Sequence, residues 1–138
     1  MSRPTVGFVG LGNMGLPMCA RLVADGYDVT AFDLRSEALD EAVASGARRG
    51  GSAAEVAGST DLFLTSLPEP RHVEAVMRTA GALAALRPGS MWIDLTTNRR
   101  ELVEELAVEA ADGVAVVDSP VTGAVDGART GRLTLFAG

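Results

Sequence analysis

The sequence contains no lysine and has few cysteine, histidine and aromatic residues. Its twelve basic residues are all arginines and stand against eighteen acidic residues, which gives a net charge of −6. This acidic balance argues against nucleic acid or an anionic membrane as the main partner. Cys19 is the single cysteine, so the chain can form no disulfide with itself and the cytoplasm is the expected compartment. We expect Cys19 to pack in the core, and we predict no metal site.

Long hydrophobic runs are also missing. The first apolar run is interrupted by glycines and by Asn13, so neither a signal peptide nor a membrane span is expected at the N-terminus. Hydrophobic residues nevertheless make up 47% of the 138 residues, which predicts one domain with a buried core.

Short apolar runs alternate with helical patterns along the chain. Strands are predicted at residues 5–9, 28–32, 61–65, 91–94, 114–118 and 133–136, and helices at 13–25, 37–45, 53–57, 71–79 and 99–111. Ser52 and Glu55 form a capping box, and Asn98 is the expected cap of the last helix. Most strands lack strict alternation, as strands covered on both faces do. The pattern predicts an α/β domain with a Rossmann-type, doubly wound, mainly parallel sheet.

The first predicted strand ends in a Gly-x-Gly-x-x-Gly motif formed by Gly10, Gly12 and Gly15. A helical pattern follows at once, and Asp33 ends the second apolar run, 18 residues after the last glycine. Gly10 allows a tight turn, Gly12 leaves room for a pyrophosphate, and Gly15 lets the helix pack close to the sheet. The helix start then offers free N–H groups to the phosphates. The sequence predicts a dinucleotide site; the alternative is a glycine-rich turn without a ligand.

The choice of dinucleotide depends on Asp33 and Arg35. Asp33 is expected to accept hydrogen bonds from the adenine ribose and to repel a 2′-phosphate, which favours NAD. Arg35 could accommodate that phosphate, so NADP stays open. The alternative role of Arg35 is a solvated residue that precedes a helix capped by Ser36.

Four segments resemble the β-hydroxyacid dehydrogenases, a family that includes 3-hydroxyisobutyrate dehydrogenase and tartronate semialdehyde reductase and is related to 6-phosphogluconate dehydrogenase. They are residues 8–18 (FVGLGNMGLPM), residues 64–68 (LTSLP), the Pro-Gly pair at 88–89 with DLTT at 94–97, and residues 118–134, which begin with DSPVTGA and end with GRLT. The resemblance spans essentially the whole chain.

The resemblance implies roles by position. Leu67 and Pro68 would lie beside the nicotinamide ribose, and Thr97 would reach the nicotinamide. His72 stands where the family often has a cofactor-contacting asparagine; its alternative is a partly exposed residue on the first turn of a helix. The implied cofactor-binding residues are Gly10, Leu11, Gly12, Asn13, Met14, Gly15, Asp33, Leu34, Arg35, Leu67, Pro68, His72 and Thr97.

The substrate motif contains Thr122, Gly123 and Ala124. The resemblance implies that Thr122 and Gly123 hold a small carboxylate substrate through a hydroxyl and a backbone N–H. Ala124 replaces a second glycine of the family, which narrows the approach to the backbone. The alternative for this stretch is a tight connection between a strand and a helix.

The family's general acid/base is a lysine in a helical C-terminal domain, and this chain has no lysine. We therefore assign no catalytic residue within the chain. Residues 1–138 are predicted to be a dinucleotide-binding domain that ends inside the substrate motif, without the helical domain. The expected function is the cofactor half of an NAD-dependent oxidoreductase for a small 3-hydroxy acid or semialdehyde, inactive by itself. The full-length protein is expected to be a homodimer or larger. The alternatives are an NADP-dependent enzyme of the imine reductase type and a non-catalytic dinucleotide-binding module.

Overall fold

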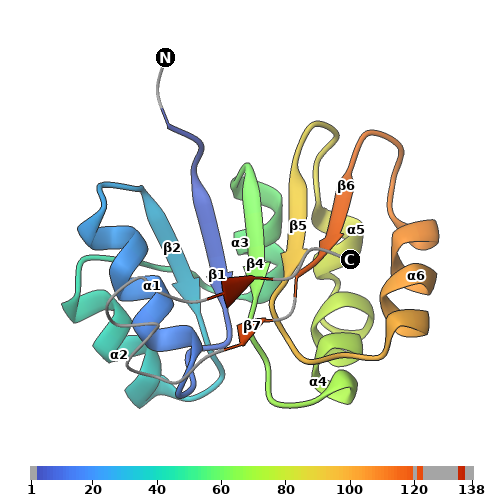
Figure 1. The fold of residues 1–138 in the computed structure, drawn as a ribbon. Helices are drawn as coiled ribbons and strands as arrows, with labels where there is room; N and C mark the ends of the chain where they lie inside the picture. The colour runs from blue at the N-terminus through green and yellow to red at the C-terminus, as the bar shows by residue number, and fades with distance from the viewer. Residues whose placement is uncertain (1–2, 120, 123–133, 136–138) are drawn as a thin grey trace.

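A computed structural model describes residues 3–119, 121–122 and 134–135. A parallel sheet of six strands forms its centre, in the order β3-β2-β1-β4-β5-β6 (Figure 1). The strands are β1 (Val6–Val9), β2 (Val29–Phe32), β3 (Arg48–Arg49), β4 (Leu62–Thr65), β5 (Met91–Asp94) and β6 (Ala115–Asp118). Strand order reverses beside β1, because β2 lies on one side of β1 and β4 on the other. This topology confirms the predicted doubly wound α/β fold.

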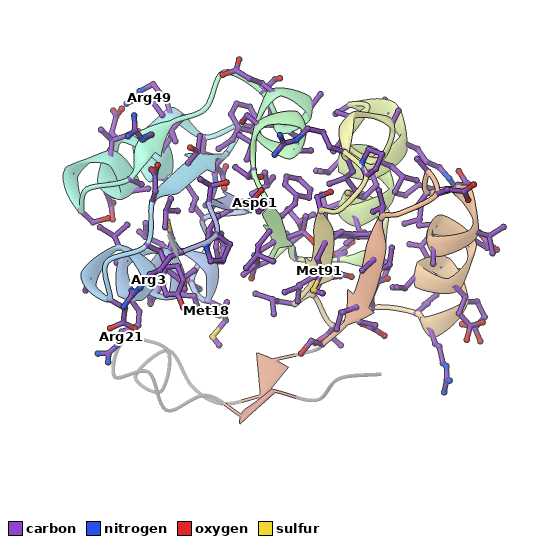
Figure 2. All side chains as sticks on the ribbon, turned by 90° about the horizontal axis from the view of Figure 1, so that it is seen from above. Arg3, Met18, Arg21, Arg49, Asp61 and Met91 are labelled. Carbon is purple, nitrogen blue, oxygen red and sulfur yellow. The ribbon has the colours of Figure 1, made fainter. Side chains whose placement is uncertain are left out.

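Helices cover both faces of the sheet (Figures 1 and 2). The helices are α1 (Gly15–Ala24), α2 (Ser36–Ala44), α3 (Ala53–Ser59), α4 (Pro70–Glu74), α5 (Ala82–Ala85) and α6 (Arg100–Glu109), with the π-helical turn η1 (Ala75–Thr79) continuing α4. Residues of α1 and α2 join one core cluster, and residues of α3, α4, η1, α5 and α6 join the other. Because both faces are buried, strands such as β1 are apolar throughout and do not alternate.

Two local predictions about buried and capping residues are confirmed. Cys19 lies in the core with no exposed surface, and burial raises the pKa of its thiol to about 11, so it is a packing residue. The Ser52 hydroxyl caps α3 by accepting a hydrogen bond from the Glu55 N–H at 3.1 Å, which is one half of the capping box; the Glu55 carboxylate accepts from the Gly51 N–H at 3.4 Å instead of the Ser52 N–H.

Other local predictions were wrong. Asn98 does not cap α6, since Arg99 occupies the N-cap position and the Asn98 amide donates to Asp94 instead. Ser36 is the first residue of α2 and does not cap it. The predicted helix over 71–79 is present; it begins one residue earlier and ends in the π-helical turn. Neither β3 nor α5 was predicted.

The strand predicted at 133–136 corresponds to β8 (Thr134–Leu135). It pairs antiparallel with β7 (Val121–Thr122), in a small sheet separate from the six parallel strands.

The starts of β1 and β4 are held together at the end of the sheet opposite to the glycine motif. The Thr5 N–H donates to Asp61 Oδ2 at 3.0 Å, and Figure 2 labels this aspartate. Within the described part of the chain, no helix has the length and hydropathy needed to cross a membrane.

Candidate functional site

The glycine motif forms a tight elbow between β1 and α1. Gly10 has a φ of +100°, and a methyl group on it would overlap the Ser66 carbonyl and lie 2.8 Å from its carbon. A methyl group on Gly15 would in turn overlap the Gly10 carbonyl. Both positions therefore exclude a side chain, so the structure confirms the tight turn at Gly10 and the close approach of the helix at Gly15.

Gly12 differs from its two neighbours because it faces open space. The nearest atom to a Cβ placed there is Arg35 Nη2, at 3.7 Å. Within residues 3–119, no backbone carbonyl accepts the N–H groups of Gly12, Asn13 or Met14. Met14 is the N-cap of α1 and forms no side-chain cap. The start of this ten-residue helix thus presents donors and a positive dipole end to an uncrowded space, as anion sites do.

Asp33 is held firmly beside this elbow. Its Oδ2 accepts from the Leu11 N–H at 2.7 Å, and its Oδ1 accepts from the Arg35 N–H at 2.8 Å. Burial acts to raise the pKa of this carboxyl, but hydrogen bonds from the Arg35 side chain, the Arg35 N–H and the Leu11 N–H outweigh it, and the pKa is lowered. Asp33 is therefore a charged acceptor at neutral pH.

Arg35 forms an ion pair with Asp33 and is nevertheless exposed. Its guanidinium lies 3.3 Å from Asp33 Oδ1, yet 64% of its side chain is exposed against 11% for Asp33. An exposed pair of this kind is worth little to stability. The sequence predicted Arg35 either as a contact for a 2′-phosphate or as a solvated residue. The structure shows a solvated side chain that also neutralises Asp33, the carboxylate expected to select the ribose.

A polar hollow of about 340 Å³ borders the elbow and Arg35. It lies outside the carboxyl ends of β1 and β2, and doubly wound sheets bind ligands outside the carboxyl ends of their strands. Its lining comprises Leu11, Gly12, Asn13, Leu16, Pro17, Arg35, Glu37, Ala38 and Glu41.

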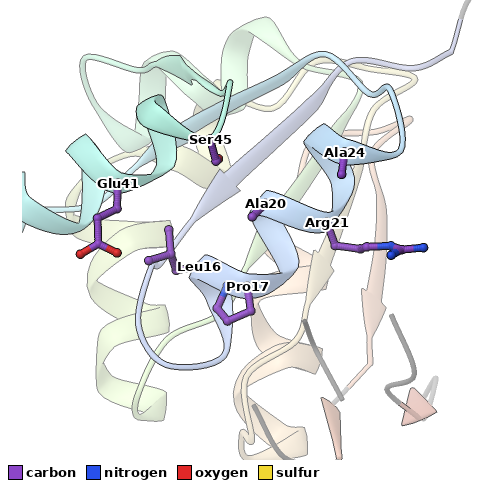
Figure 3. A pocket seen from close by; sticks show the side chains of 7 residues that line it. All are labelled: Leu16, Pro17, Ala20, Arg21, Ala24, Glu41 and Ser45. Atoms are coloured by element: carbon purple, nitrogen blue, oxygen red, sulfur yellow. The ribbon is translucent and has the colours of Figure 1, made fainter. Parts of the chain in front are cut away.

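A second hollow of about 390 Å³ lies between α1 and α2 (Figure 3). Leu16, Pro17 and Glu41 border both hollows, whereas Ala20, Ala24 and Ser45 extend the second one along the helices. No residue predicted to bind cofactor or substrate lines it, so we place the candidate site at the first hollow.

The residues predicted for the nicotinamide end lie in loops after β4 and β5. The Leu67 N–H donates to Thr96 Oγ1 at 3.0 Å, which joins the two loops, while Pro68 and Thr97 are exposed. His72 lies on the first turn of α4, partly buried. Its Nδ1 is buried and has no hydrogen-bond partner in the part of the chain that the structure describes.

Sequence reasoning missed a buried polar network beneath these loops. Asp94 has no exposed surface and accepts from the Thr65 hydroxyl at 2.9 Å and from the Asn98 amide at 2.7 Å. Trp92 Nε1–H donates to Thr65 Oγ1 at 3.0 Å. The signal available in the sequence was a carboxylate at the end of an apolar strand, a residue type that is buried only with partners.

Asp118 lies beside Asp94 on the neighbouring strand, as its register partner. Burial raises the pKa of Asp118 and the charge of Asp94 raises it further, while Arg100 offsets part of the effect. Its Oδ1 is buried without a hydrogen-bond partner among the described residues. Two carboxyl groups placed in this way repel each other when both are charged.

Asp118→Asn is expected to stabilise the domain by about 1 kcal/mol near neutral pH, because it removes this repulsion. A carboxyl with a raised folded-state pKa stabilises the fold below its unfolded pKa and loses that contribution as the pH rises through the folded pKa. The gain over wild type should therefore vanish near pH 4, about the unfolded pKa, and grow above it. Urea unfolding between pH 4 and 8 measures it; a gain that does not change with pH would contradict this account.

The predicted substrate residues are only partly described. Thr122 lies in β7, paired through its backbone with Thr134, whereas Gly123 and Ala124 fall outside the described residues. Their role stays a prediction.

Known proteins are similar to this chain in sequence and in fold. The NAD-binding domain of 6-phosphogluconate dehydrogenase matches residues 5–138. The 2-(hydroxymethyl)glutarate dehydrogenase of Eubacterium barkeri is 38% identical over 135 residues, which cover 96% of this chain and 45% of that enzyme. The solved 3-hydroxyisobutyrate dehydrogenase of Mycobacterium tuberculosis with L-serine has a TM-score of 0.91 and 36% identity, covering 99% of this chain and 47% of that one. The chain thus spans under half the length of these relatives.

Imine reductases are more distant. The enzyme of Myxococcus stipitatus in complex with NADP+ has a TM-score of 0.81 at 19% identity, covering 90% of this chain and 43% of that one. This similarity shows the fold alone.

Proposed function

Because the chain belongs to the family of the NAD-binding domain of 6-phosphogluconate dehydrogenase, we propose that it is the cofactor-binding part of an NAD-dependent oxidoreductase for a small 3-hydroxy acid or its semialdehyde. The observation that carries this proposal is the elbow at Gly10 and Gly15. It leaves Gly12 uncovered at the start of α1, with the charged Asp33 fixed beside it.

The residues of the elbow fit a dinucleotide. In this proposal Gly12 gives the pyrophosphate access to the backbone, and the N–H groups around Asn13, Met14 and Gly15 bind its oxygens. Leu11 fixes Asp33 through its N–H, so the carboxylate is oriented before any ribose hydroxyl arrives. Preorganised groups bind more tightly because less freedom is lost on binding.

The preference for NAD is part of the proposal. Asp33 accepts from ribose hydroxyls and repels a 2′-phosphate, while Leu34 and Arg35 follow it along the rim of the site. Arg35 keeps most of its side chain exposed, so it can leave Asp33 for a phosphate at small cost. We therefore propose that NADP is accepted more weakly than NAD.

The remaining predicted residues serve the reactive end in this proposal. Leu67 and Pro68 lie beside the nicotinamide ribose, Thr97 reaches the nicotinamide, and His72 is near the cofactor. Thr122 and Gly123 hold the substrate carboxylate, next to Ala124. When bound, the nicotinamide exchanges a hydride with the substrate carbon. The substrates of relatives, 3-hydroxyisobutyrate and L-serine, are the ones we propose to test first.

Proton transfer needs a group that this chain does not supply. All of its basic residues other than His72 are arginines, which stay protonated at neutral pH and are poor general acids. We propose that this chain binds NAD but does not turn over substrate by itself. We also propose a homodimer or larger for the whole protein, and the cytoplasm as its compartment on the basis of the single cysteine.

Calorimetry with NADH and NADPH tests the proposal directly. The chain should bind NADH more tightly than NADPH, and neither 3-hydroxyisobutyrate nor L-serine should be oxidised. Absence of binding to both cofactors would refute the proposed function. A clear preference for NADPH would refute the role of Asp33.

Asp33→Asn is expected to weaken NADH binding by about 10- to 100-fold, since a charged acceptor for the ribose is lost. NADPH binding should fall less, because Arg35 is released and the repelling charge is gone. Titration calorimetry measures both affinities. The control is Asp40→Asn, which removes a carboxylate paired with Arg49 on the outer side of α2 and should leave both affinities unchanged.

A further inference from the structure

The buried network under the strand ends connects the core to the loops at the proposed nicotinamide end. It begins with the indole of Trp92, which donates to the Thr65 hydroxyl, and Thr65 donates to Asp94 Oδ1. All three residues have no exposed surface. The carboxylate of Asp94 is therefore held in one orientation by packed neighbours on β4 and β5.

From Asp94 the network runs outward into both loops. Asp94 Oδ1 also accepts from the Thr96 N–H at 3.1 Å, which fixes the turn after β5. The Thr96 hydroxyl, on a side chain with 2% exposure, accepts from the Leu67 N–H at 3.0 Å. Thr96 is thus positioned by the Asp94 carboxylate and in turn positions the loop after β4.

The Leu67 loop has a second tie on its other side. The Ser66 N–H donates to the Val9 carbonyl at 3.0 Å, which places the loop against the end of β1. Without Thr96, this tie would remain, but the Leu67 N–H would lose its acceptor in the described structure. Pro68 and Thr97, which lie just beyond the two tied residues, are exposed.

We infer that Thr96, anchored by Asp94, is a positioning residue that sets the Leu67 loop and Thr97 for the nicotinamide half of the cofactor. The inference rests on the proposed function. It adds that the two halves of the cofactor depend on different parts of the chain: the adenosine and pyrophosphate on the elbow and Asp33, and the nicotinamide on the Asp94 network.

This division makes a positioning role separable from a merely structural one. ADP carries the adenosine and the pyrophosphate but lacks both the second ribose and the nicotinamide ring. Loss of loop positioning should weaken NADH and spare ADP. General damage to the fold should weaken both ligands alike, because the elbow packs against the carbonyl of Ser66 in the same loop.

The experiment compares Thr96→Val with the wild-type chain by calorimetry with NADH and with ADP. Valine preserves the shape and the N–H bond to Asp94 but removes the acceptor for Leu67. We expect NADH affinity to fall by about tenfold and ADP affinity to change by less than about twofold. Thr96→Ser, which restores the hydroxyl, should return NADH affinity to within about twofold of wild type.

The matched control is Thr60→Val. Thr60 is as buried as Thr96, and its hydroxyl donates to the Val56 carbonyl at 2.8 Å, but it precedes β4 and so lies at the opposite edge of the sheet. Both affinities should be unchanged in this variant. If Thr96→Val does not fold, Asn98→Ala removes one donor to Asp94 and should show the same selective loss at about threefold.

Three outcomes would overturn the inference. Equal weakening of NADH and ADP would show a structural role only. Unchanged NADH affinity in a folded Thr96→Val chain would show that the loop does not need this tie. A wild-type chain that binds neither ligand would refute the proposed function itself, and that result is recognised before any variant is made.

Discussion

Gly10→Ala is expected to lower the free energy of unfolding by about 3–5 kcal/mol, which is a large part of the stability of a domain this size. Two costs add at this position. The backbone has a φ of +100°, which alanine rarely adopts, and the new methyl group would overlap the Ser66 carbonyl. The loop after β4 would have to move away from β1, breaking the bond from the Ser66 N–H to the Val9 carbonyl. Urea denaturation followed by circular dichroism measures the change.

Gly12→Ala is the matched control for this prediction. The same methyl group at Gly12 meets nothing nearer than 3.7 Å, and this glycine is not among those with positive φ. Its stability should therefore stay within about 0.5 kcal/mol of wild type. Equal stability of the two alanine variants would mean that the elbow is not as tight as the structure shows.

Gly12→Val is expected to weaken NADH binding by more than about 100-fold while the fold survives. The side chain would extend into the open space next to Arg35, which is the space proposed for the pyrophosphate. Valine would also keep phosphate oxygens away from the N–H groups at the start of α1. Calorimetry gives the affinity, and urea denaturation of the same sample shows that the variant is folded.

Unchanged NADH binding in the Gly12→Val variant would contradict the proposed site. A folded Gly12→Val chain that binds NADH as the wild type does would place the pyrophosphate elsewhere. If Gly12→Val lowers the free energy of unfolding by more than about 1 kcal/mol, its NADH affinity does not test the site. Gly12→Ala, which adds a smaller side chain, would then have to bind NADH more weakly than the wild type.

Some elements were predictable because their causes are local. The apolar runs of β1, β2, β4 and β5 are short, continuous and separated by helical patterns, and such a pattern has few topologies open to it. The elbow was predictable for a related reason. The positive φ of Gly10 and the close approach of Gly15 to the Gly10 carbonyl arise within one short segment, so the spacing of these glycines is visible in the sequence. The overlap of a Gly10 side chain with Ser66 is not.

Other elements have causes far away in the chain. β3 consists of two exposed arginines and is a strand only because it pairs with β2. α5 has four residues and depends on its packing against α3 and the π-helical turn, as short helices do. Asn98 looked like a cap, but its Oδ1 accepts from the N–H of the adjacent Arg99, and its NH2 group donates to a buried carboxylate on β5. A local pattern cannot show the partner on β5.

The amino-acid sequence by itself determined the alternation of strands and helices, the glycine elbow and the acidic residue expected beside it, because each is marked by residue types and spacings visible along the chain. Only the tertiary structure decided that the Leu11 N–H fixes Asp33, that Thr96 joins the loops after β4 and β5, and that Asp118 lies beside Asp94. These contacts join residues from different loops or strands. Their energies depend on burial and on partners that the folded sheet brings together.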